Sequence, residues 1–320
     1  MYQLKQMSKQ VEGLEIADKI IRDIIENGLG NLKVQINDYK CGTQELGNYY
    51  IPNIQKLMVE LLENLEEELE KVSKLIVKTQ SLVSNAKICF IECIENNIIT
   101  QEANDFLEEV GYEWTAQELL NLGLVRENSQ LVQLNLWVDE VKNKKIEVAY
   151  WLDLNSGSIN FSCNEILDKQ LINDSEFDVI MPTPLIYYNS REFAKITWLT
   201  YSTRKFTLED IITIKSFATD IKTGVEKAKL YFISSLSKDI FPVLISYETI
   251  GIVDDRYILQ DKNKDQIYLN KVDSVYFEMK DIYENQIMFG VIDKNFVLNV
   301  ISLVTNSHIL RVSEKFILDN

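Results

Sequence analysis

The spacing of apolar residues changes near residue 128, and this change constrains the fold more than any other feature of the sequence. Before it, apolar residues recur every three or four positions, as in an amphipathic helix. After it, apolar and polar residues alternate with a period of two, which is typical of half-buried strands. The sequence therefore predicts an α+β protein, with an N-terminal helical bundle over residues 1–127. A mostly antiparallel β-rich domain with one or two inserted helices follows over residues 128–320.

Two amphipathic stretches define the predicted bundle. The first ends at Gly28 and Gly30, and its apolar face comprises Leu14, Ala17, Ile20, Ile21, Ile24 and Ile25. The second is a single long helix that opens at residues 50–52 and carries a heptad seam of Met58, Leu62, Leu65, Leu69, Val72 and Ile76. Residues 84–97 and 100–114 are predicted to complete the group. Because these helical segments lie close by in sequence, we expect an intramolecular bundle and not a dimeric coiled coil.

The β-rich part begins with three predicted strands, at residues 130–141, 142–154 and 156–163, with turns at 142–145 and 155–157. Residues 181–189 hold two of the four prolines and are predicted to be an extended crossing segment. Thr207, three residues before Asp210, predicts a helix cap, and one or two helices follow to about residue 237. Further strands are predicted within residues 243–253, 255–261, 266–270, 274–280, 286–293 and 296–304. Aromatic residues in strand-like segments are expected to pack across strands: Trp137, Tyr150, Trp151, Trp198 and Tyr201.

Both parts of the chain are acidic, and the formal net charge is −16. Residues 1–127 contain 12 basic and 22 acidic side chains, which leaves 21 basic and 27 acidic side chains in residues 128–320. Such a charge repels a phosphate backbone and opposes general nucleic-acid binding, so a protein or cationic partner fits better. The sequence has neither a long apolar run nor the apolar core of a secretory signal near its start, and we expect a cytoplasmic protein.

The sequence contains few candidates for catalysis. The single histidine, His308, would need a nucleophile and an acid from elsewhere, and no G-x-S-x-G surrounds any serine. We therefore interpret it as a polar residue on a strand edge. Gly28-Leu29-Gly30 ends a helix, whereas a nucleotide-binding glycine loop connects a strand to the helix that follows it. The carboxylates at 66–68 and 108–109 fall on polar helix faces, where solvated charge explains them. No catalytic or cofactor-binding residue is predicted.

Two patterns could be taken for metal sites. Cys89 and Cys93 share a helix face, but a zinc site would need Cys41 and Cys163, or His308, from distant segments. The sequence favours reduced, buried thiols for all four cysteines, with Cys89 and Cys93 in an apolar core.

The second pattern lies at residues 261–266. Asp261, Asn263 and Asp265 match the first, third and fifth positions of a calcium loop. Gln266 and Val272 stand where that loop needs glycine and glutamate. The flanking segments alternate like strands, so this stretch is predicted to be a hairpin turn without an ion.

Several residue groups, distributed over nearly the whole chain, resemble a known family. They are Gly13-Leu14-Glu15, Gly28-Leu29, Phe241-Pro242, residues 261–265 and Phe289-Gly290. In this arrangement the chain resembles the region downstream of the zinc finger in bacterial SWIM zinc-finger proteins. The finger itself, Cys-x-Cys followed by Cys-x-His, is absent, so its zinc and its nucleic-acid role are not carried over. The family's Asp-x-x-Gly hairpin also lacks its glycine here, and Asn263 tolerates the left-handed backbone that glycine would supply.

The resemblance implies a function through partners. Proteins of this family are commonly associated with MoxR-type ATPases and von Willebrand factor A proteins in bacterial systems thought to act in conflict or defence. The chain would then be a non-catalytic, protein-binding adaptor or scaffold subunit. Two alternatives stay open at this point. One is a metal-dependent hydrolase that acts on nucleic acid or nucleotides through clustered carboxylates, and the other is a nucleic-acid-binding module.

Overall fold

A computed structural model describes residues 2–28, 32–64, 69–141, 144–166, 177–234, 236–270 and 285–311. The chain divides into two compact units, Met1–Thr115 and Ala116–Asn320. The first unit is helical and the second is built from antiparallel sheets, which confirms the predicted α+β class. The second unit begins before residue 128 because α6 (Ala116–Asn121) and β1 (Val125–Arg126) both contact β5 (Val179–Tyr187).

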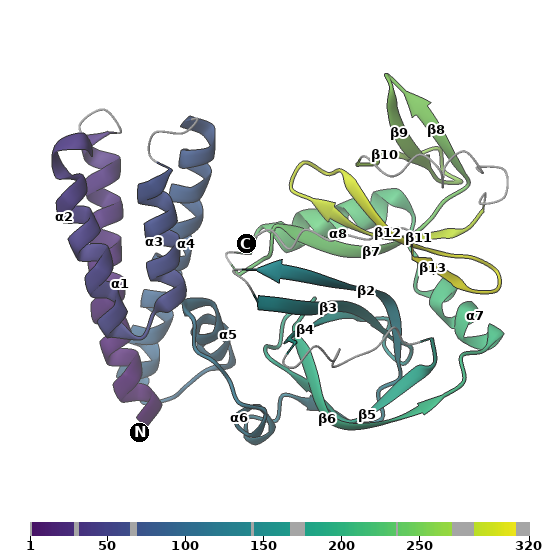
Figure 1. Ribbon diagram of the computed structural model, residues 1–320, viewed down its shortest axis with the longest axis horizontal. Helices are drawn as coiled ribbons and strands as arrows, with labels where there is room; N and C mark the ends of the chain where they lie inside the picture. The colour runs from purple at the N-terminus through teal and green to yellow at the C-terminus, as the bar shows by residue number, and fades with distance from the viewer. Residues whose placement is uncertain are drawn as a thin grey trace. The chain divides into compact units, whose positions relative to one another are not determined.

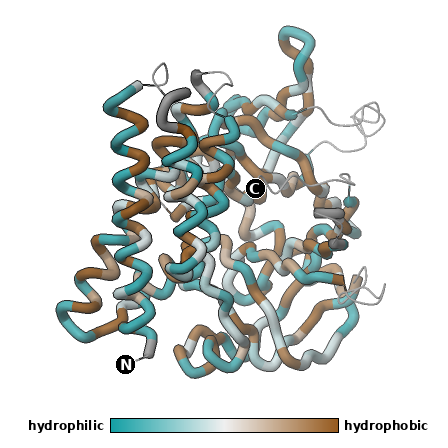
Figure 2. Tube along the Cα trace, turned by 60° about the vertical axis from the view of Figure 1, so that its left-hand side comes forward, coloured by the Kyte–Doolittle hydropathy of each residue, from teal (hydrophilic) through white to brown (hydrophobic). Residues whose placement is uncertain are grey.

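The helical unit contains α1 (Tyr2–Asn27), α2 (Leu32–Glu45), the 3-10 turn η2 (Leu46–Tyr49), α3 (Pro52–Glu63), α4 (Leu69–Asn96) and α5 (Gln101–Val110). Figure 1 shows α1 to α4 running alongside one another as a bundle. Hydrophobic and hydrophilic residues alternate along these helices (Figure 2), as expected when one face of each helix packs inward. The predicted face of α1 is buried except for Ile25, which is exposed. The sequence pattern does not predict α2.

The predicted long helix through residues 50–76 is wrong. Helix α3 ends at Glu63, where Asn64 caps it: the Asn64 side-chain Nδ2 donates to the Glu60 carbonyl at 2.7 Å. The chain begins a new helix at Leu69, and α3 and α4 pack against each other. Met58, Leu62 and Val72 are buried, so the apolar seam does face the core, but from two helices.

Close approach of two backbones explains Gly13 in the middle of α1. A Cβ atom at this position would lie 2.5 Å from the Cβ of Tyr49 in η2. Only glycine fits such a contact without displacement of the neighbour. Gly13 of the Gly-Leu-Glu group therefore has a packing role in the bundle, whereas Glu15 is exposed.

A buried carboxylate joins α1 to α4. Asp18 accepts hydrogen bonds from Arg22 at 2.6 Å, from Gln80 at 2.9 Å and from Lys87. Burial by itself would raise the pKa of Asp18, but the bonds from Lys87, Gln80 and Arg22 outweigh it and hold the pKa below its ordinary value. The charged form of Asp18 therefore stabilises the folded bundle.

The second unit begins with a six-stranded antiparallel sheet in the order β1-β5-β2-β3-β4, with β6 paired to β5. Its further strands are β2 (Leu131–Val141), β3 (Lys144–Asp153), β4 (Ile159–Glu165) and β6 (Ile196–Arg204). The sequence predicts an extended crossing segment at residues 181–189, and the structure instead places most of them in β5. Pro184 is tolerated because it has no partner in the β5–β6 register, in which Thr183 pairs Thr200 and Leu185 pairs Trp198. The other proline, Pro182, stays in the register opposite Tyr201.

A second sheet has the order β13-β12-β11-β7, from β7 (Ile240–Ser246), β11 (Ile287–Asp293), β12 (Leu298–Val304) and β13 (Ile309–Arg311). A third has the order β10-β9-β8, from β8 (Thr249–Val253), β9 (Arg256–Gln260) and β10 (Gln266–Tyr268). The first and second sheets share one apolar core, in which the Tyr150 ring meets the Phe289 ring edge-on at 5.3 Å. The strand predicted at 274–280 lies outside the described residues.

Two helices, α7 (Leu208–Ser216) and α8 (Ile221–Phe232), separate β6 from β7 in the chain. The predicted cap of α7 is confirmed. The Thr207 side chain accepts from the Asp210 backbone N–H, and the Asp210 carboxylate accepts from the Thr207 backbone N–H at 2.8 Å. None of the described helices has the length and apolarity that crossing a membrane requires.

Replacement of Asp18 tests the link between α1 and α4. We expect Asp18→Asn to lower the free energy of unfolding by roughly 1–3 kcal/mol at neutral pH, because Lys87 and Arg22 lose a charged acceptor. The pKa of Asp18 is lowered by folding, so this stabilisation is complete above the unfolded value of about 3.9 and disappears as the pH falls through the folded value. Urea unfolding of the parent and the variant at neutral and acidic pH measures this difference in unfolding free energy.

The matched control is Glu26→Gln, an exposed acid on the same helix, which should leave the unfolding free energy nearly unchanged. An Asp18→Asn protein as stable as the parent at neutral pH would contradict this account of the bundle.

Candidate functional site

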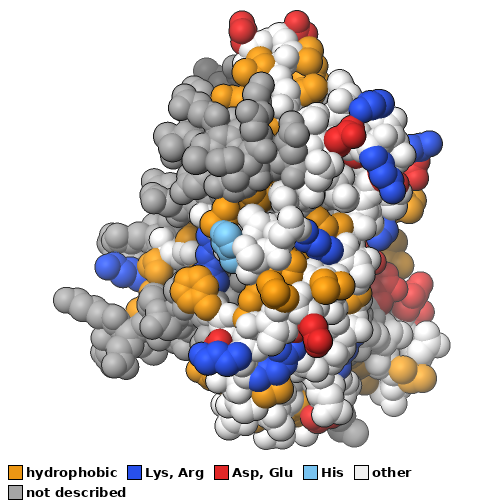
Figure 3. Space-filling view, turned by 90° about the vertical axis from the view of Figure 1, so that its right-hand side faces the viewer, with side chains coloured by type: hydrophobic (Ala, Val, Ile, Leu, Met, Phe, Trp, Pro, Cys, Tyr) orange, Lys and Arg blue, Asp and Glu red, His pale blue; other side chains and the backbone are white. Residues whose placement is uncertain are grey.

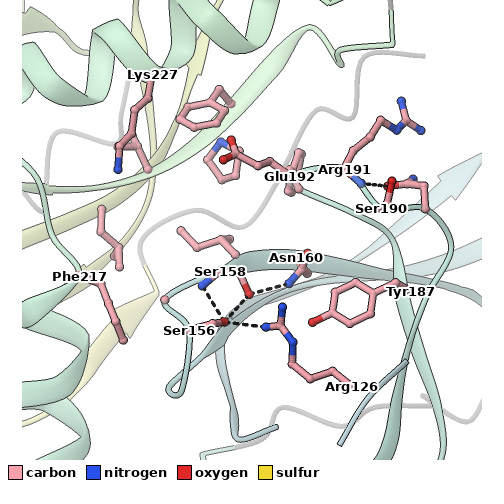
Figure 4. Close-up of a pocket in the computed structure, with 18 of the residues that line it drawn as sticks. Arg126, Ser156, Ser158, Asn160, Tyr187, Ser190, Arg191, Glu192, Phe217 and Lys227 are labelled. Carbon is pink, nitrogen blue, oxygen red and sulfur yellow. Dashed lines mark hydrogen bonds between the residues drawn. The ribbon is translucent and has the colours of Figure 1, made fainter. Parts of the chain in front are cut away.

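The second unit contains a cavity of about 600 Å³ (Figure 4). It is walled by segments far apart in sequence: residues 123–126, the β3–β4 turn, the β5–β6 loop, the α7–α8 link, and parts of α8 and β7. Its volume is within the range of pockets that bind small organic molecules. No residue of β6 itself lines it.

The β3–β4 turn supplies the floor of the cavity and is organised by a buried carboxylate. Asp153, at the end of β3, accepts from the backbone N–H of Asn155 at 3.0 Å and from the Ser156 hydroxyl at 3.2 Å. Gly157 has φ +71°, and a Cβ there would lie 2.5 Å from the ring of Phe217. The positive φ and the close contact both require glycine at this position. The turn predicted at 155–157 is confirmed, and it packs directly against Phe217.

A chain of side-chain hydrogen bonds runs along this turn, and its direction follows from Asp153. An ionised carboxylate only accepts, so Ser156 donates its single hydroxyl proton to Asp153. In the 2.8 Å contact between the two hydroxyls, Ser158 is then the donor to Ser156. Asn160 donates to Ser158 at 3.3 Å and accepts from the Ala194 backbone N–H at 3.2 Å. The hydroxyl protons at this wall are therefore used within the protein.

Arg126, on β1, is held at the edge of the turn. Its Nη1 donates to Asp153 at 3.2 Å and to the Ser156 hydroxyl at 2.9 Å. Its guanidinium also lies 5.5 Å from the centre of the Tyr187 ring, within the range of a cation–π contact. Within the described part of the chain, its Nε and Nη2 make no hydrogen bond.

Tyr187 positions this arginine from the end of β5. Its hydroxyl is buried and makes no hydrogen bond of normal geometry with the described residues. Burial raises the pKa of Tyr187, while Arg126 and the nearby Ser158 hydroxyl lower it less strongly. The phenol is therefore neutral at physiological pH, and its ring packs beside the charged guanidinium.

Three further charged side chains and an apolar wall complete the cavity. Figure 4 shows Lys227 of α8 reaching into it from the side opposite Arg126, with Glu192 nearby. Arg191 donates to the Leu236 carbonyl, and its guanidinium points away from Arg126. Phe217, Phe241, Pro242 and Leu244 form the apolar lining. The cavity thus combines cationic groups with aromatic surface.

His308 lies outside this cavity, exposed and directly before β13. Its Nδ1 lies 2.7 Å from the Ser307 hydroxyl, and its backbone carbonyl accepts from the Thr305 N–H at 2.9 Å. Figure 3 shows the imidazole at the surface among hydrophobic and basic side chains. The structure therefore places it in the turn that precedes β13, beside the strand and not on it as the sequence predicted.

The cysteine pair lies inside the helical unit. Cys89 and Cys93 are buried in α4, and burial raises the pKa of Cys89 to about 12. Cys163 is half-buried, but Cys41 is exposed, so not all of the thiols lie in a core. Among the residues that the structure describes, no three His, Cys, Asp or Glu side chains gather closely enough to hold a metal ion.

The stretch at 261–265 is the predicted hairpin turn, between the antiparallel strands β9 and β10. The buried Asp261 carboxylate accepts from the backbone N–H groups of Asn263 at 2.8 Å and Asp265 at 3.1 Å, and from that of Ile221 at 3.0 Å. Asp261 therefore also accepts the first backbone N–H of α8, beside the N-cap residue Asp220, and the sequence pattern does not predict this contact. Lys264, with φ +70°, and not Asn263, adopts the left-handed backbone.

No protein-family model matches the chain, and no curated protein matches it either. The resemblance to SWIM zinc-finger proteins therefore stays a prediction based on the residue groups given above. Of these groups, Phe241-Pro242 lines the cavity. The cavity's polar residues were not predicted, and only the turn at 155–157 gave a local signal for any of them.

Thiol labelling tests the positions of the cysteines. At about pH 8, we expect Cys41 to react rapidly with a disulfide reagent and Cys89 to react slowly, because Cys89 is buried and its pKa is raised to about 12. Cys41→Ser should abolish the fast phase, whereas Cys89→Ser should leave it intact. Labelling of Cys89 in the folded protein as fast as that of Cys41 would contradict the packing of α4.

Proposed function

We propose that this chain is a non-catalytic, protein-binding adaptor or scaffold subunit that receives an extended segment of a partner protein along β6. The observation that carries the proposal is the exposed edge of this strand. Residues 199–203 are all exposed, and the Leu199 and Tyr201 side chains are 60% and 50% accessible to solvent. These two residues are separated by one position, so they share a face of the strand.

The edge of β6 is available for pairing. Within the described residues, β5 is its ladder partner, and the single bridge from Phe161 to Lys195 ends just before β6 begins. An unpaired strand edge offers backbone donors and acceptors to another strand, and natural sheets usually protect such edges with charges or short strands. Residues 199–203 contain no charged side chain.

The strand is held in place without covering this edge. Trp198 packs edge-on against Trp151 of β3, with ring centres 5.3 Å apart. Arg204, at the end of β6, pairs with Asp210 at 2.7 Å and with Gln130 at 2.7 Å. An ordered edge loses less conformational entropy when a partner strand binds, which favours recognition.

The proposed partner is a MoxR-type ATPase or a von Willebrand factor A protein, in a cytoplasmic bacterial conflict or defence system. This part of the proposal is supported by the resemblance to SWIM zinc-finger proteins. The net charge of −16 favours a partner with a basic face, because complementary charge speeds association. The chain by itself is then expected to show no steady-state hydrolysis of nucleotides.

Cross-linking in the native host tests the proposal. With a photoreactive amino acid at position 201, the tagged chain should cross-link to one such partner and recover it on purification. Leu199→Lys with Tyr201→Lys should reduce recovery of that partner about tenfold or more, because charges at a strand edge oppose pairing. Leu230→Lys, at a 72% exposed apolar position on α8, is the matched control and should leave recovery unchanged.

Equal recovery with the Leu199→Lys/Tyr201→Lys variant would exclude the β6 edge as the binding surface. Absence of any specific protein partner, or nucleotide hydrolysis by the purified chain, would contradict the adaptor function itself.

A further inference from the structure

Arg126 presents an unused hydrogen-bonding edge at the cavity. Its Nη1 is already fixed by Asp153 and Ser156, so the side chain is held in one orientation before any ligand arrives. The Nε and Nη2 edge makes no hydrogen bond within the described part of the chain, and this edge is one that binds a carboxylate or phosphate in bidentate fashion. The Tyr187 ring packs beside the guanidinium and restricts its movement further.

Lys227 supplies a second cation from the opposite wall. It is exposed, and its ammonium makes no hydrogen bond or ion pair with the described residues, although it reaches into the cavity in Figure 4. Its ammonium can therefore approach a ligand without loss of a contact within the described part of the protein. Arg126 and Lys227 therefore face a shared space from β1 and α8.

Two cations, Arg126 and Lys227, face this space, whereas Arg191 points away from it. They are matched in number by Glu192 and by the buried Asp153, which is already paired with Arg126. The net charge of −16 favours a ligand with a single oxyanion group over a polyanion, whose long-range repulsion from the chain would be larger.

The remaining lining suits the uncharged body of such a ligand. Phe217, Phe241 and Pro242 provide aromatic and apolar surface, and about 600 Å³ accommodates a molecule of the size of a mononucleotide or an aromatic acid. The Ser156 and Ser158 protons are used within the protein, so recognition of the anion falls mainly to the two cations.

We propose that this cavity binds a small organic molecule that carries one carboxylate or phosphate group. The Nε and Nη2 of Arg126 bind the oxyanion, Lys227 adds a second contact, and the body of the ligand packs against Phe217, Phe241 and Pro242. The site is separate from the β6 edge, because no residue of β6 lines the cavity.

Calorimetry with the full chain at low salt tests the proposal with four probes. The anions are adenosine monophosphate and phenylpropionate, and their uncharged counterparts are adenosine and phenylpropionamide. At least one anion should bind, its affinity should fall as salt is added, and its uncharged counterpart should bind about tenfold or more weakly. Binding of adenosine monophosphate alone identifies the ligand group as a phosphate, and binding of phenylpropionate alone identifies it as a carboxylate.

Three variants locate the binding. Arg126→Lys keeps a cation beside Asp153 but removes the bidentate edge, and should weaken anion binding about tenfold. Lys227→Gln should weaken it about threefold or more, whereas Lys222→Gln, at an exposed lysine of the same helix outside the cavity, should not change it. Circular dichroism measures whether each variant is folded. If Arg126→Lys does not fold, the Lys227→Gln variant alone is used to test the site.

Three results would overturn the proposal. One is the absence of binding by both anions up to about 10 mM, which corresponds to a negligible affinity. Another is equal binding by the uncharged counterparts. The third is unchanged anion binding in both the Arg126→Lys and Lys227→Gln variants.

Discussion

The antiparallel pairing of β5 determines the geometry of the β-rich unit. Strand β6 pairs with β5 from Val179 to Tyr187. Strand β1 also pairs with β5, at Leu185 and Ile186, and β2 pairs with it at Ile180. The register of β1 on β5 sets Arg126 opposite Leu185, which brings its guanidinium beside Tyr187 at the mouth of the β5–β6 loop. The same strand therefore supports both the exposed edge of β6 and the cationic side of the cavity.

Buried carboxylates organise the rest of this acidic chain. Asp18 joins two helices, and Asp153 orders the β3–β4 turn. Asp210 completes the capping box of α7, and Asp261 accepts the first N–H of α8 while closing the β9–β10 hairpin. Each accepts bonds from backbone N–H groups or from Lys, Arg and Gln side chains, which offset the cost of burying a charge. The chain thus uses a small part of its negative charge internally, and the remainder is left for interactions with solvent and partners.

Local patterns in the sequence predicted elements whose signal lies within a few residues. The change in period near residue 128, the cap formed by Thr207 and Asp210, and the hairpin at 261–265 belong to this group. The break between α3 and α4 was missed because the apolar seam continues through it, and a heptad spacing carries no information about reversal of the chain. The strand β5 was missed because its two prolines suggested a loop, whereas a skip in the register accommodates Pro184.

The cavity could not be predicted for a different reason. Arg126, Ser156, Tyr187 and Lys227 are far apart in sequence, and only the order of strands in the first sheet and the position of α8 bring them together. No spacing within one segment reports such an arrangement. The edge of β6 was equally hidden, because Leu199 and Tyr201 have the alternation of any half-buried strand.

Amide hydrogen exchange of the chain with and without its partner distinguishes strand addition at β6 from binding elsewhere. If the partner adds a strand to β6, the amides of residues 199–203 become protected in the complex, since strand pairing engages backbone N–H groups. Protection confined to other surfaces, with β6 exchanging as it does in the free chain, would contradict strand addition.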